Sequence, residues 1–267
     1  MNNLTIVDIK TEKEIKKIKE AAVIVSKILN IVKNKIGVGM SSFDLEEMIC
    51  KYIKKFGCRP AFKGYRGYPA CSCISINHEL VHGVPNRKKI IKEGQIVSID
   101  IGINYEGFYA DAATTVFISS SNIENKDKIL NLLNTTYNVI LDVLNHIKDG
   151  VGVSQIGGYI QKYVEERGFN VIREYVGHAI GRNLHEKPDI PNFNSNQPDV
   201  VYENMVICIE PMVSMGDWRT SVLDDGWTVV MKDGSLCAHF EHMVLVKKDT
   251  AELLTSKEAI EPLIIEA

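Results

Sequence analysis

The chain has none of the sequence features that mark a membrane or secreted protein. No apolar run approaches the roughly 20 residues that a membrane-spanning helix needs. No apolar segment of the kind found in signal peptides occurs in the first residues, MNNLTIVDIKTEKEIKK. There is also no long run of one charge sign, and the net charge is −3, so neither nucleic-acid nor membrane binding is indicated. These absences predict a cytoplasmic protein.

The chain also lacks a CxxC motif, although it contains six cysteines. The cysteines are Cys50, Cys58, Cys71, Cys73, Cys208 and Cys237. Because the sequence shows no leader, we expect all six to be reduced. The composition, 45% hydrophobic and 24% charged over 267 residues, is that of an ordinary globular protein with a sizeable core.

Apolar residues at helical spacing predict four helices. The helices are expected at about 11–37, 41–57, 125–147 and 154–167. Strands are expected at 72–76, 98–114, 174–176, 205–212, 227–231 and 236–246. The segment 187–198 contains three prolines and is expected to be irregular. This mixture predicts an α/β (α+β) fold.

Three short patches of the first half recur in the second half in the same order. GVGMSS at 37–42 resembles GVGVSQ at 150–155, KYIKKFG at 51–57 resembles KYVEERG at 162–168, and GQIVSID at 94–100 resembles NMVICIE at 204–210. The offsets of 113, 111 and 110 residues predict a duplicated helix–helix–strand unit. We therefore expect one domain over 1–267, with related halves at about 11–121 and 122–247. A pseudo-two-fold axis between the halves would bring Asp100 and Glu210 to a shared cleft.

The segment 98–114, SIDIGINYEGFYADAAT, predicts a β-hairpin that carries two aspartates. If the turn is centred between Tyr105 and Glu106, Asp100 lies directly opposite Asp111, with Cβ atoms roughly 4.5–5.5 Å apart. Two carboxylates at that distance repel by about 3 kcal/mol at an effective dielectric of 20. Either one of them is protonated or a metal ion lies between them. The alternative is a surface hairpin with two solvated acids.

Five other acids and histidines stand beside glycine or in otherwise apolar strands. They are His82, His178, His185, Glu210 and Glu241. A glutamate buried in a strand is costly unless it is paired or bound to a metal. Each of these residues alone is more often structural. Together, four buried acids without matching buried cations indicate divalent ions.

One imidazole and four carboxylates form a hard, oxygen-rich ligand set. Such a set suits Mn, Fe(II), Co or Zn better than a structural thiolate zinc site. Four carboxylates are enough to bridge two ions. Paired ions are a standard hydrolytic device, with a bridging hydroxide as nucleophile.

Several motifs in the same order resemble those of type I methionine aminopeptidases in their short bacterial form. The motifs are GYPACSCISINHELVHGVP at 67–85, the Asp100–Asp111 spacing, REYVGHAIGRNLHEKP at 173–188, IEPM at 209–212 and the strand around Glu241. The resemblance implies the pita-bread fold, in which two pseudo-two-fold-related helix–helix–strand halves surround a central antiparallel sheet. It implies a dinuclear metalloaminopeptidase that removes the N-terminal methionine from nascent proteins whose second residue is small, by means of a metal-bridging hydroxide. It further implies a monomer that works on nascent chains at the ribosome.

The resemblance also assigns roles to individual residues. The five metal ligands would be Asp100, Asp111, His178, Glu210 and Glu241, with Asp111 and Glu241 bridging two divalent ions. His82 and His185 would contact the substrate and the tetrahedral intermediate, and Glu210 would also carry a proton. The pocket for the methionine side chain would be lined by Phe62, Tyr65, Tyr68, Cys73, Leu184 and Trp227.

Four positions depart from the family pattern without removing a metal ligand. Ala179 replaces a glycine of the usual GHGIG motif, and we expect its methyl group to narrow the cleft. His78 stands where an acid is usual, and Phe62 and Leu184 replace a cysteine and a phenylalanine of the pocket. These changes affect the shape of the pocket and the rate.

Three alternative functions make predictions that the sequence does not match. A proline-directed aminopeptidase would carry an additional N-terminal domain, whereas only about ten residues precede the first predicted helix. A non-catalytic binding protein of the same fold would have lost metal ligands, and all five are present. A structural calcium site would leave His82, His178 and His185 without a role.

Overall fold

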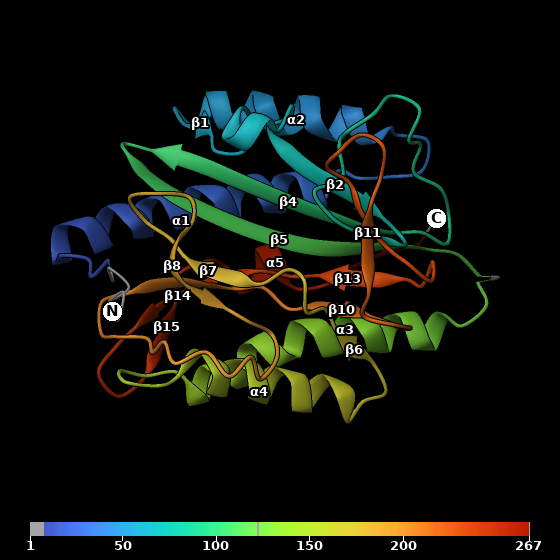
Figure 1. The fold of residues 1–267 in the computed structure, drawn as a ribbon. Helices are drawn as coiled ribbons and strands as arrows, with labels where there is room; N and C mark the ends of the chain where they lie inside the picture. The colour runs from blue at the N-terminus through green and yellow to red at the C-terminus, as the bar shows by residue number, and fades with distance from the viewer. Residues whose placement is uncertain (1–7, 122, 267) are drawn as a thin grey trace.

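The computed structural model describes residues 8–121 and 123–266, which form strands flanked by helices (Figure 1). Helices α1 (Glu12–Lys33) and α2 (Ser42–Lys55) pack on the sheet that contains the predicted aspartate hairpin. Helices α3 (Lys126–Val143) and α4 (Val153–Glu165) pack on each other across the strands from α1 and α2. The predicted α/β fold is therefore confirmed. None of the helices in the described part of the chain is long and apolar enough to cross a bilayer.

The four predicted helices are confirmed, and local signals explain where they begin. At the start of α1, Thr11 accepts a hydrogen bond from the Glu14 backbone N–H, and the Glu14 carboxylate accepts one from the Thr11 N–H at 2.8 Å. Ser41 and Asp44 form the same capping box at the start of α2. Two short helical turns, η1 (Tyr65–Gly67) and η2 (Leu144–His146), and helix α5 (Lys257–Ile260) complete the helical part of the described chain.

Two five-stranded sheets form the centre of the structure. The first contains β1 (Arg59–Pro60), β4 (Ile96–Tyr105), β5 (Phe108–Ser119) and β16 (Leu263–Glu266) in that order, with β2 (Ser72–Ile76) also paired to β4. The second contains β15 (Ala251–Leu253), β14 (His242–Val246), β9 (Val206–Ile209), β7 (Gly177–Ala179) and β8 (Glu186–Ile190). A bridge between Ala113 and Glu241 joins the two sheets. It places the aspartate hairpin beside the strands of the second half.

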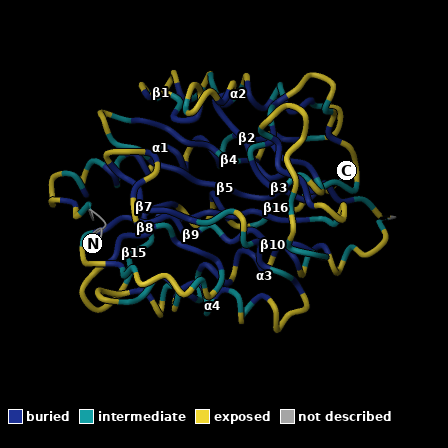
Figure 2. The backbone as a smooth tube through the Cα atoms, viewed as in Figure 1, coloured by how far each residue is buried: buried dark blue, intermediate teal, exposed yellow. Residues whose placement is uncertain are grey.

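Two three-stranded sheets lie at one end of the five-stranded pair. One orders β13 (Cys237–His239), β10 (Met212–Ser214) and β6 (Asn170–Val171), and the other orders β11 (Thr220–Val222), β12 (Val229–Met231) and β3 (Glu79–Val81). Buried residues follow the strands through the middle of the molecule, whereas the exposed residues lie on loops and outer helix faces (Figure 2). Ile99, Ile101 and Ile103 of β4 are among the fully buried residues, as their alternation in the sequence predicts.

The hairpin forms, but its predicted register is wrong. Tyr105 pairs with Phe108, so the turn is the two residues Glu106 and Gly107, which have φ angles of 49° and 92°. Positive φ at both turn residues gives the primed turn that matches the twist of the strands. Consequently, Asp100 pairs with Ala113, and Asp111 lies two positions away on the same face. The two aspartates are diagonal rather than opposed neighbours.

Three expectations about the strands are also wrong. Residues 174–176 are not a strand, because the strand begins at Gly177. Residues 186–190 form β8 despite Pro188, which is possible because β8 is an edge strand of its sheet. The strands predicted at 205–212 and 236–246 are each broken beside their glutamate. Glu210 separates β9 from β10, and Glu241 separates β13 from β14.

The prediction that all six cysteines are reduced is wrong for one pair. Cys50 of α2 and Cys71 form a disulfide, with their Cα atoms 6.1 Å apart. The Glu46 carboxylate, one turn before Cys50, accepts hydrogen bonds from the backbone N–H of Cys71 at 2.6 Å and of Ser72 at 3.1 Å. These bonds attach the backbone at Cys71 to α2, one turn away from Cys50. The other four cysteines are free and buried.

Candidate metal centre

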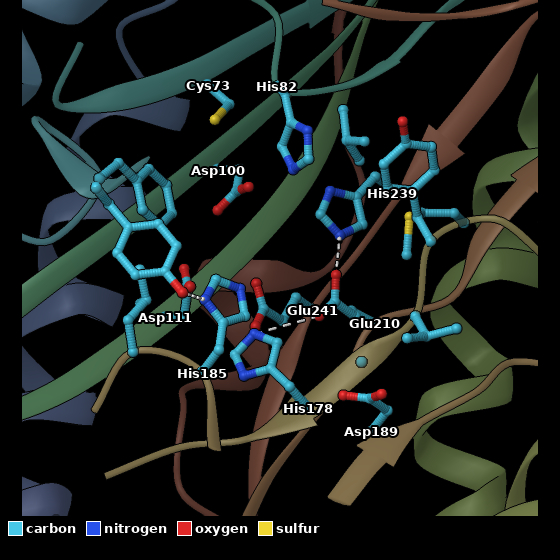
Figure 3. A pocket seen from close by; sticks show the side chains of 18 of the residues that line it. Cys73, His82, Asp100, Asp111, His178, His185, Asp189, Glu210, His239 and Glu241 are labelled. Carbon is cyan, nitrogen blue, oxygen red and sulfur yellow. Dashed lines mark hydrogen bonds and ion pairs between the residues drawn. The ribbon is translucent and has the colours of Figure 1, made fainter. Parts of the chain in front are cut away.

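All of the site residues expected from the sequence line one cavity of about 470 Å³. The cavity lies between the aspartate hairpin and the strands of the second sheet (Figure 3). Asp100 and Asp111 come from β4 and β5, and His178 comes from β7. Glu210 and Glu241 follow β9 and β13, at the strand breaks described above. Five separate segments therefore bring these four acids and His178 to one cavity.

Three of the four acids converge closely enough to share a cation, whereas Glu210 belongs to neither of the groups that follow. Ligand atoms of Asp100, Asp111 and Glu241 all lie within 4.8 Å of one another, as do those of His178, Cys208 and Glu241. Asp100 Oδ1 and Glu241 Oε1 are buried and have no hydrogen-bond partner among the described residues. Buried oxygens without partners are costly. The residues present therefore fit a divalent ion, which would satisfy these oxygens.

Burial also raises the pKa values of the four acids. Desolvation, followed by repulsion from the neighbouring carboxylates, raises the pKa of Asp100, Glu210 and Glu241 well above their usual values. Desolvation raises the pKa of Asp111 to about 7. In the absence of a cation, the cluster therefore retains protons that free carboxylic acids would lose. A bound cation would favour the ionised forms.

His178 directs an unprotonated ring nitrogen, with its lone pair, towards the acidic cluster. Its Nδ1 lies 3.0 Å from the Ala179 carbonyl, which can only accept, so Nδ1 must carry the proton. The unprotonated Nε2 faces the acids, 3.5 Å from Glu210 Oε1. Burial lowers the pKa of His178 to about 4 and keeps the ring neutral. A second group bonded to the other ring nitrogen is the usual arrangement for a metal-binding histidine.

His82 and His185 enter the cavity from two different segments (Figure 3). His185 stacks on Tyr65, with ring centroids 5.1 Å apart, and its Nδ1 lies 3.0 Å from the Tyr65 hydroxyl. His82 contacts the edge of Tyr175, with centroids 5.5 Å apart. Desolvation in the cavity lowers the pKa of both histidines, that of His185 to about 3, although His185 as a whole residue is exposed. Both are therefore neutral near pH 7.

An apolar pocket adjoins the acids. Tyr68 packs edge-on against Trp227, with ring centroids 5.2 Å apart, and Cys73 pairs with Asp100 across β2 and β4. The ring of Phe62 occupies the space that a side chain at Gly102 would fill. The aromatic wall therefore begins directly beside the carboxylates.

Two of the sequence departures lie away from the cavity. Ala179 pairs with Ile207 and does not line the cavity, so the expectation that its methyl group narrows the cleft is wrong. His78 is exposed and does not line it either. Phe62 and Leu184 do line the cavity, where they shape the apolar pocket.

Sequence reasoning missed His239. It is buried, and its Nε2 lies 3.4 Å from Glu210 Oε2, with no hydrogen-bond partner among the described residues. The Glu210 carboxylate thus lies between His178 and His239 (Figure 3). The signal was available, because His239 stands two residues before Glu241 and shares the face of that segment.

Comparison with known proteins agrees with this geometry. The model of metallopeptidase family M24 matches residues 16–248. A methionine aminopeptidase of Mycoplasma capricolum is 42% identical over 253 residues, which cover 94% of this chain and 99% of that protein.

Solved structures show the same fold. A crystal structure of methionine aminopeptidase from Thermotoga maritima superposes with a TM-score of 0.89 at 44% identity, covering 94% of this chain and all of that one. An X-Pro aminopeptidase from Thermotoga maritima, at 22% identity and a TM-score of 0.75, shares the fold, and this chain covers 64% of its length. The predicted pita-bread fold is therefore confirmed. The chain belongs to metallopeptidase family M24 and, within that family, to the methionine aminopeptidases.

Proposed function

We propose that this chain removes the N-terminal methionine from polypeptides whose second residue is small. The main support is that one cavity holds both an apolar aromatic pocket and buried carboxylate oxygens that have no hydrogen-bond partner within residues 8–121 and 123–266. The pocket suits an unbranched apolar side chain, and the acids suit the ions of a hydrolase. Membership of a metallopeptidase family implies divalent metal binding by the chain.

Two ions are proposed, of Co, Mn, Fe(II) or Zn, held by one shared set of ligands. The ligands would be Asp100, Asp111, His178, Glu210 and Glu241, with Asp111 and Glu241 common to both ions. In support, ligand atoms of Asp100, Asp111 and Glu241 lie within 4.8 Å of one another, and Glu241 also belongs to the group around His178. When bound, such ions polarise a carbonyl group and lower the pKa of water towards neutrality, as the predicted bridging hydroxide requires.

The remaining groups bind substrate and move protons. If Tyr65 donates its O–H to His185 Nδ1, the Nε2–H of His185 is left to point at a substrate oxygen. A neutral imidazole N–H stabilises the charge that develops on that oxygen. His82 has the same role from the other segment. Glu210, whose carboxylate lies between His178 and His239, would take a proton and pass it to the leaving amine.

The proposed substrate is the N-terminus of a nascent chain at the ribosome, and such a substrate implies a cytoplasmic enzyme. We propose separately that the enzyme is a monomer. We also propose that residues 1–267 form one catalytic domain with related halves at 11–121 and 122–247. In support, isolated bridges occur at equivalent places in the two halves, Ser41 with Ile90 and Gly152 with Val200. The paired positions differ by 111 and 110 residues, close to the offsets of the repeated patches.

Substrate choice provides the direct test. Met-Gly, Met-Ala, Met-Val, Met-Leu, Leu-Ala and Pro-Ala peptides should be compared for release of the first residue. We expect Met-Ala to be cleaved about 100-fold faster than Met-Leu or Leu-Ala, because a misfitting side chain costs 1–3 kcal/mol in such pockets. N-acetylated Met-Ala serves as the control and should not be cleaved. Equal rates on Leu-Ala and Met-Ala would leave only a broad aminopeptidase.

The histidines should separate by role. His178→Ala should lower metal content, because its Nε2 faces the acids. His82→Ala and His185→Ala should lower kcat about 100-fold with metal content near normal, because they are proposed to act on the substrate. Metal analysis and steady-state rates on Met-Ala-Ser measure both effects. An empty site in His185→Ala with a full one in His178→Ala would reverse the assignment.

A further inference from the structure

A loop without regular structure carries two of the cavity residues. Residues 180–185 connect β7 to β8 and present Leu184 and His185 to the cavity. Inside the loop, the Gly181 N–H donates to the Asn183 carbonyl at 3.1 Å. The Asn183 N–H donates to Glu186 Oε1 at 2.9 Å. The loop therefore closes on the carboxylate of Glu186, the residue that follows His185.

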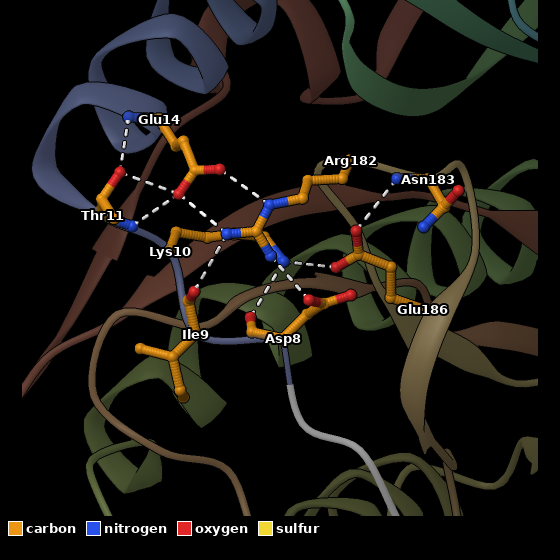
Figure 4. A network of polar contacts seen from close by, with 8 residues as sticks. All are labelled: Asp8, Ile9, Lys10, Thr11, Glu14, Arg182, Asn183 and Glu186. Atoms are coloured by element: carbon orange, nitrogen blue, oxygen red, sulfur yellow. Dashed lines mark hydrogen bonds and ion pairs between the residues drawn. The ribbon is translucent and has the colours of Figure 1, made fainter.

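The second oxygen of that carboxylate is held from outside the loop. Lys10, just before α1, forms an ion pair with Glu186 Oε2, and its ammonium group also donates to the Asp8 carbonyl at 2.9 Å (Figure 4). The side chains of Lys10 and Glu186 are only 1% and 2% exposed. The backbone of Lys10 is itself anchored, because its N–H donates to the Asn204 carbonyl at 3.1 Å.

Lys10 also contacts the start of the loop. A side chain at Gly181 would occupy the space of the Lys10 stem, so the stem runs directly over this glycine. The Gly181 carbonyl in turn accepts a hydrogen bond from Tyr109 of β5 at 2.8 Å. Lys10 thus contacts Gly181 at one end of the loop and Glu186 at the other.

A buried ion pair is weak support for stability, because desolvating two charges offsets most of their attraction. An apolar pair could fill the same space. What the Lys10–Glu186 pair supplies is a fixed position for the residue next to it. Among the described residues, the His185 ring has its polar contact with the Tyr65 hydroxyl. The position of the ring therefore also depends on the backbone that carries it.

We propose that Lys10 is a positioning residue. Through Glu186, it holds the loop 180–185 so that the His185 ring stays stacked on Tyr65 at the cavity wall. Its effect on turnover rests on the function proposed for His185 above. Its effect on the position of the ring does not, and the two can be measured separately.

The test uses the double variant Lys10→Met/Glu186→Gln. Removing both charges avoids a buried unpaired carboxylate, which would threaten folding in Lys10→Met alone. Nuclear Overhauser contacts between the His185 and Tyr65 rings should be lost or weakened at least twofold. In the same protein, kcat on Met-Ala-Ser should fall about tenfold, because small misplacements of a reacting group are costly. When His185→Ala is already present, the added loss should be less than twofold.

Lys33→Met is the matched control. Lys33 is also buried and lies at the other end of α1, where its ammonium group donates to the carbonyls of Glu258 and Glu261. It should lose a buried charge as Lys10 does but keep the ring contact and kcat within twofold. If the double variant retains the ring contact, or lowers kcat equally with and without His185, the positioning role is wrong. If the unaltered protein releases no methionine, the proposed function fails, and the ring contact still decides the role of Lys10.

Discussion

Asp111→Ala is expected to lose both activity and metal. Ligand atoms of Asp111 lie with those of Asp100 and Glu241 in the acidic cluster, and Asp111 is proposed to be common to both ions. Bound ions contribute several kcal/mol of transition-state stabilisation. At 1.36 kcal/mol per tenfold, the rate should fall by on the order of a thousandfold. Rates on Met-Ala-Ser and the metal content of the purified variant measure the two losses together.

The matched control is Asp249→Ala, an exposed aspartate in the turn before β15. It should change neither the rate nor the metal content by more than twofold. Full activity of Asp111→Ala after chelator treatment would exclude a metal-dependent reaction at this cluster. Loss of activity with unchanged metal content would instead confine Asp111 to the chemistry.

The metal-free protein should become less stable as pH rises. Burial raises the pKa of Asp111 to about 7, whereas the pKa of an aspartate in the unfolded chain is 3.8. Between these values the folded state keeps a proton that the unfolded state has lost. The protonated Asp111 therefore contributes fully to the free energy of unfolding at low pH, and this contribution is lost as pH rises through about 7. A difference of about three pKa units corresponds to a loss of roughly 4 kcal/mol.

Added metal should reverse this trend. Metal competes with protons for the same carboxylates, so its stabilising effect should be larger at pH 7 than at pH 5. At 100 times Kd the gain is about 2.7 kcal/mol, or roughly 5–10 °C in Tm for a chain of this size. Thermal melts of chelator-treated protein with and without millimolar Mn, at both pH values, give the comparison. An unchanged Tm at pH 7 would contradict a carboxylate-lined metal site.

The sequence predicted which residues meet, but not how the backbone delivers them. Asp100 and Asp111 share a face in both the predicted and the observed register, because a shift of the turn by one residue changes the pair sum by two. The pairing itself depends on whether Glu106 accepts positive φ, which alternation of apolar residues does not reveal. The sequence therefore predicted that the two aspartates share a face of the hairpin, but not which residue pairs with Asp100.

The breaks at Glu210 and Glu241 were hidden for a related reason. Each glutamate interrupts an apolar run that continues on both sides, so the run predicts a single strand. In the structure the chain passes from one sheet to another at each acid, which turns its side chain into the cavity. Long-range packing decides such a break. The Cys50–Cys71 bond is likewise tertiary, because α2 and the segment before β2 meet only after folding.

For His239, in contrast, the sequence did contain the information about its position. Its place two residues before Glu241 is sufficient to put it on the same face, but the sequence alone does not show that a histidine there is buried beside Glu210. The structure gives it weight through burial and its distance of 3.4 Å from Glu210.

Strand β16 has a consequence for how copies of the protein coexist at high concentration. It runs parallel to β5 from Val116 to Ser119 and covers the end of that strand. Further along, the backbone of β5 bonds Glu241 at Ala113 and Gly181 at Tyr109. A long apolar strand with free N–H and C=O groups is a template for intermolecular pairing and aggregation. At these positions the strand that supplies Asp111 directs its outer backbone groups to β16, Glu241 and Gly181, and they are not free to pair with another molecule.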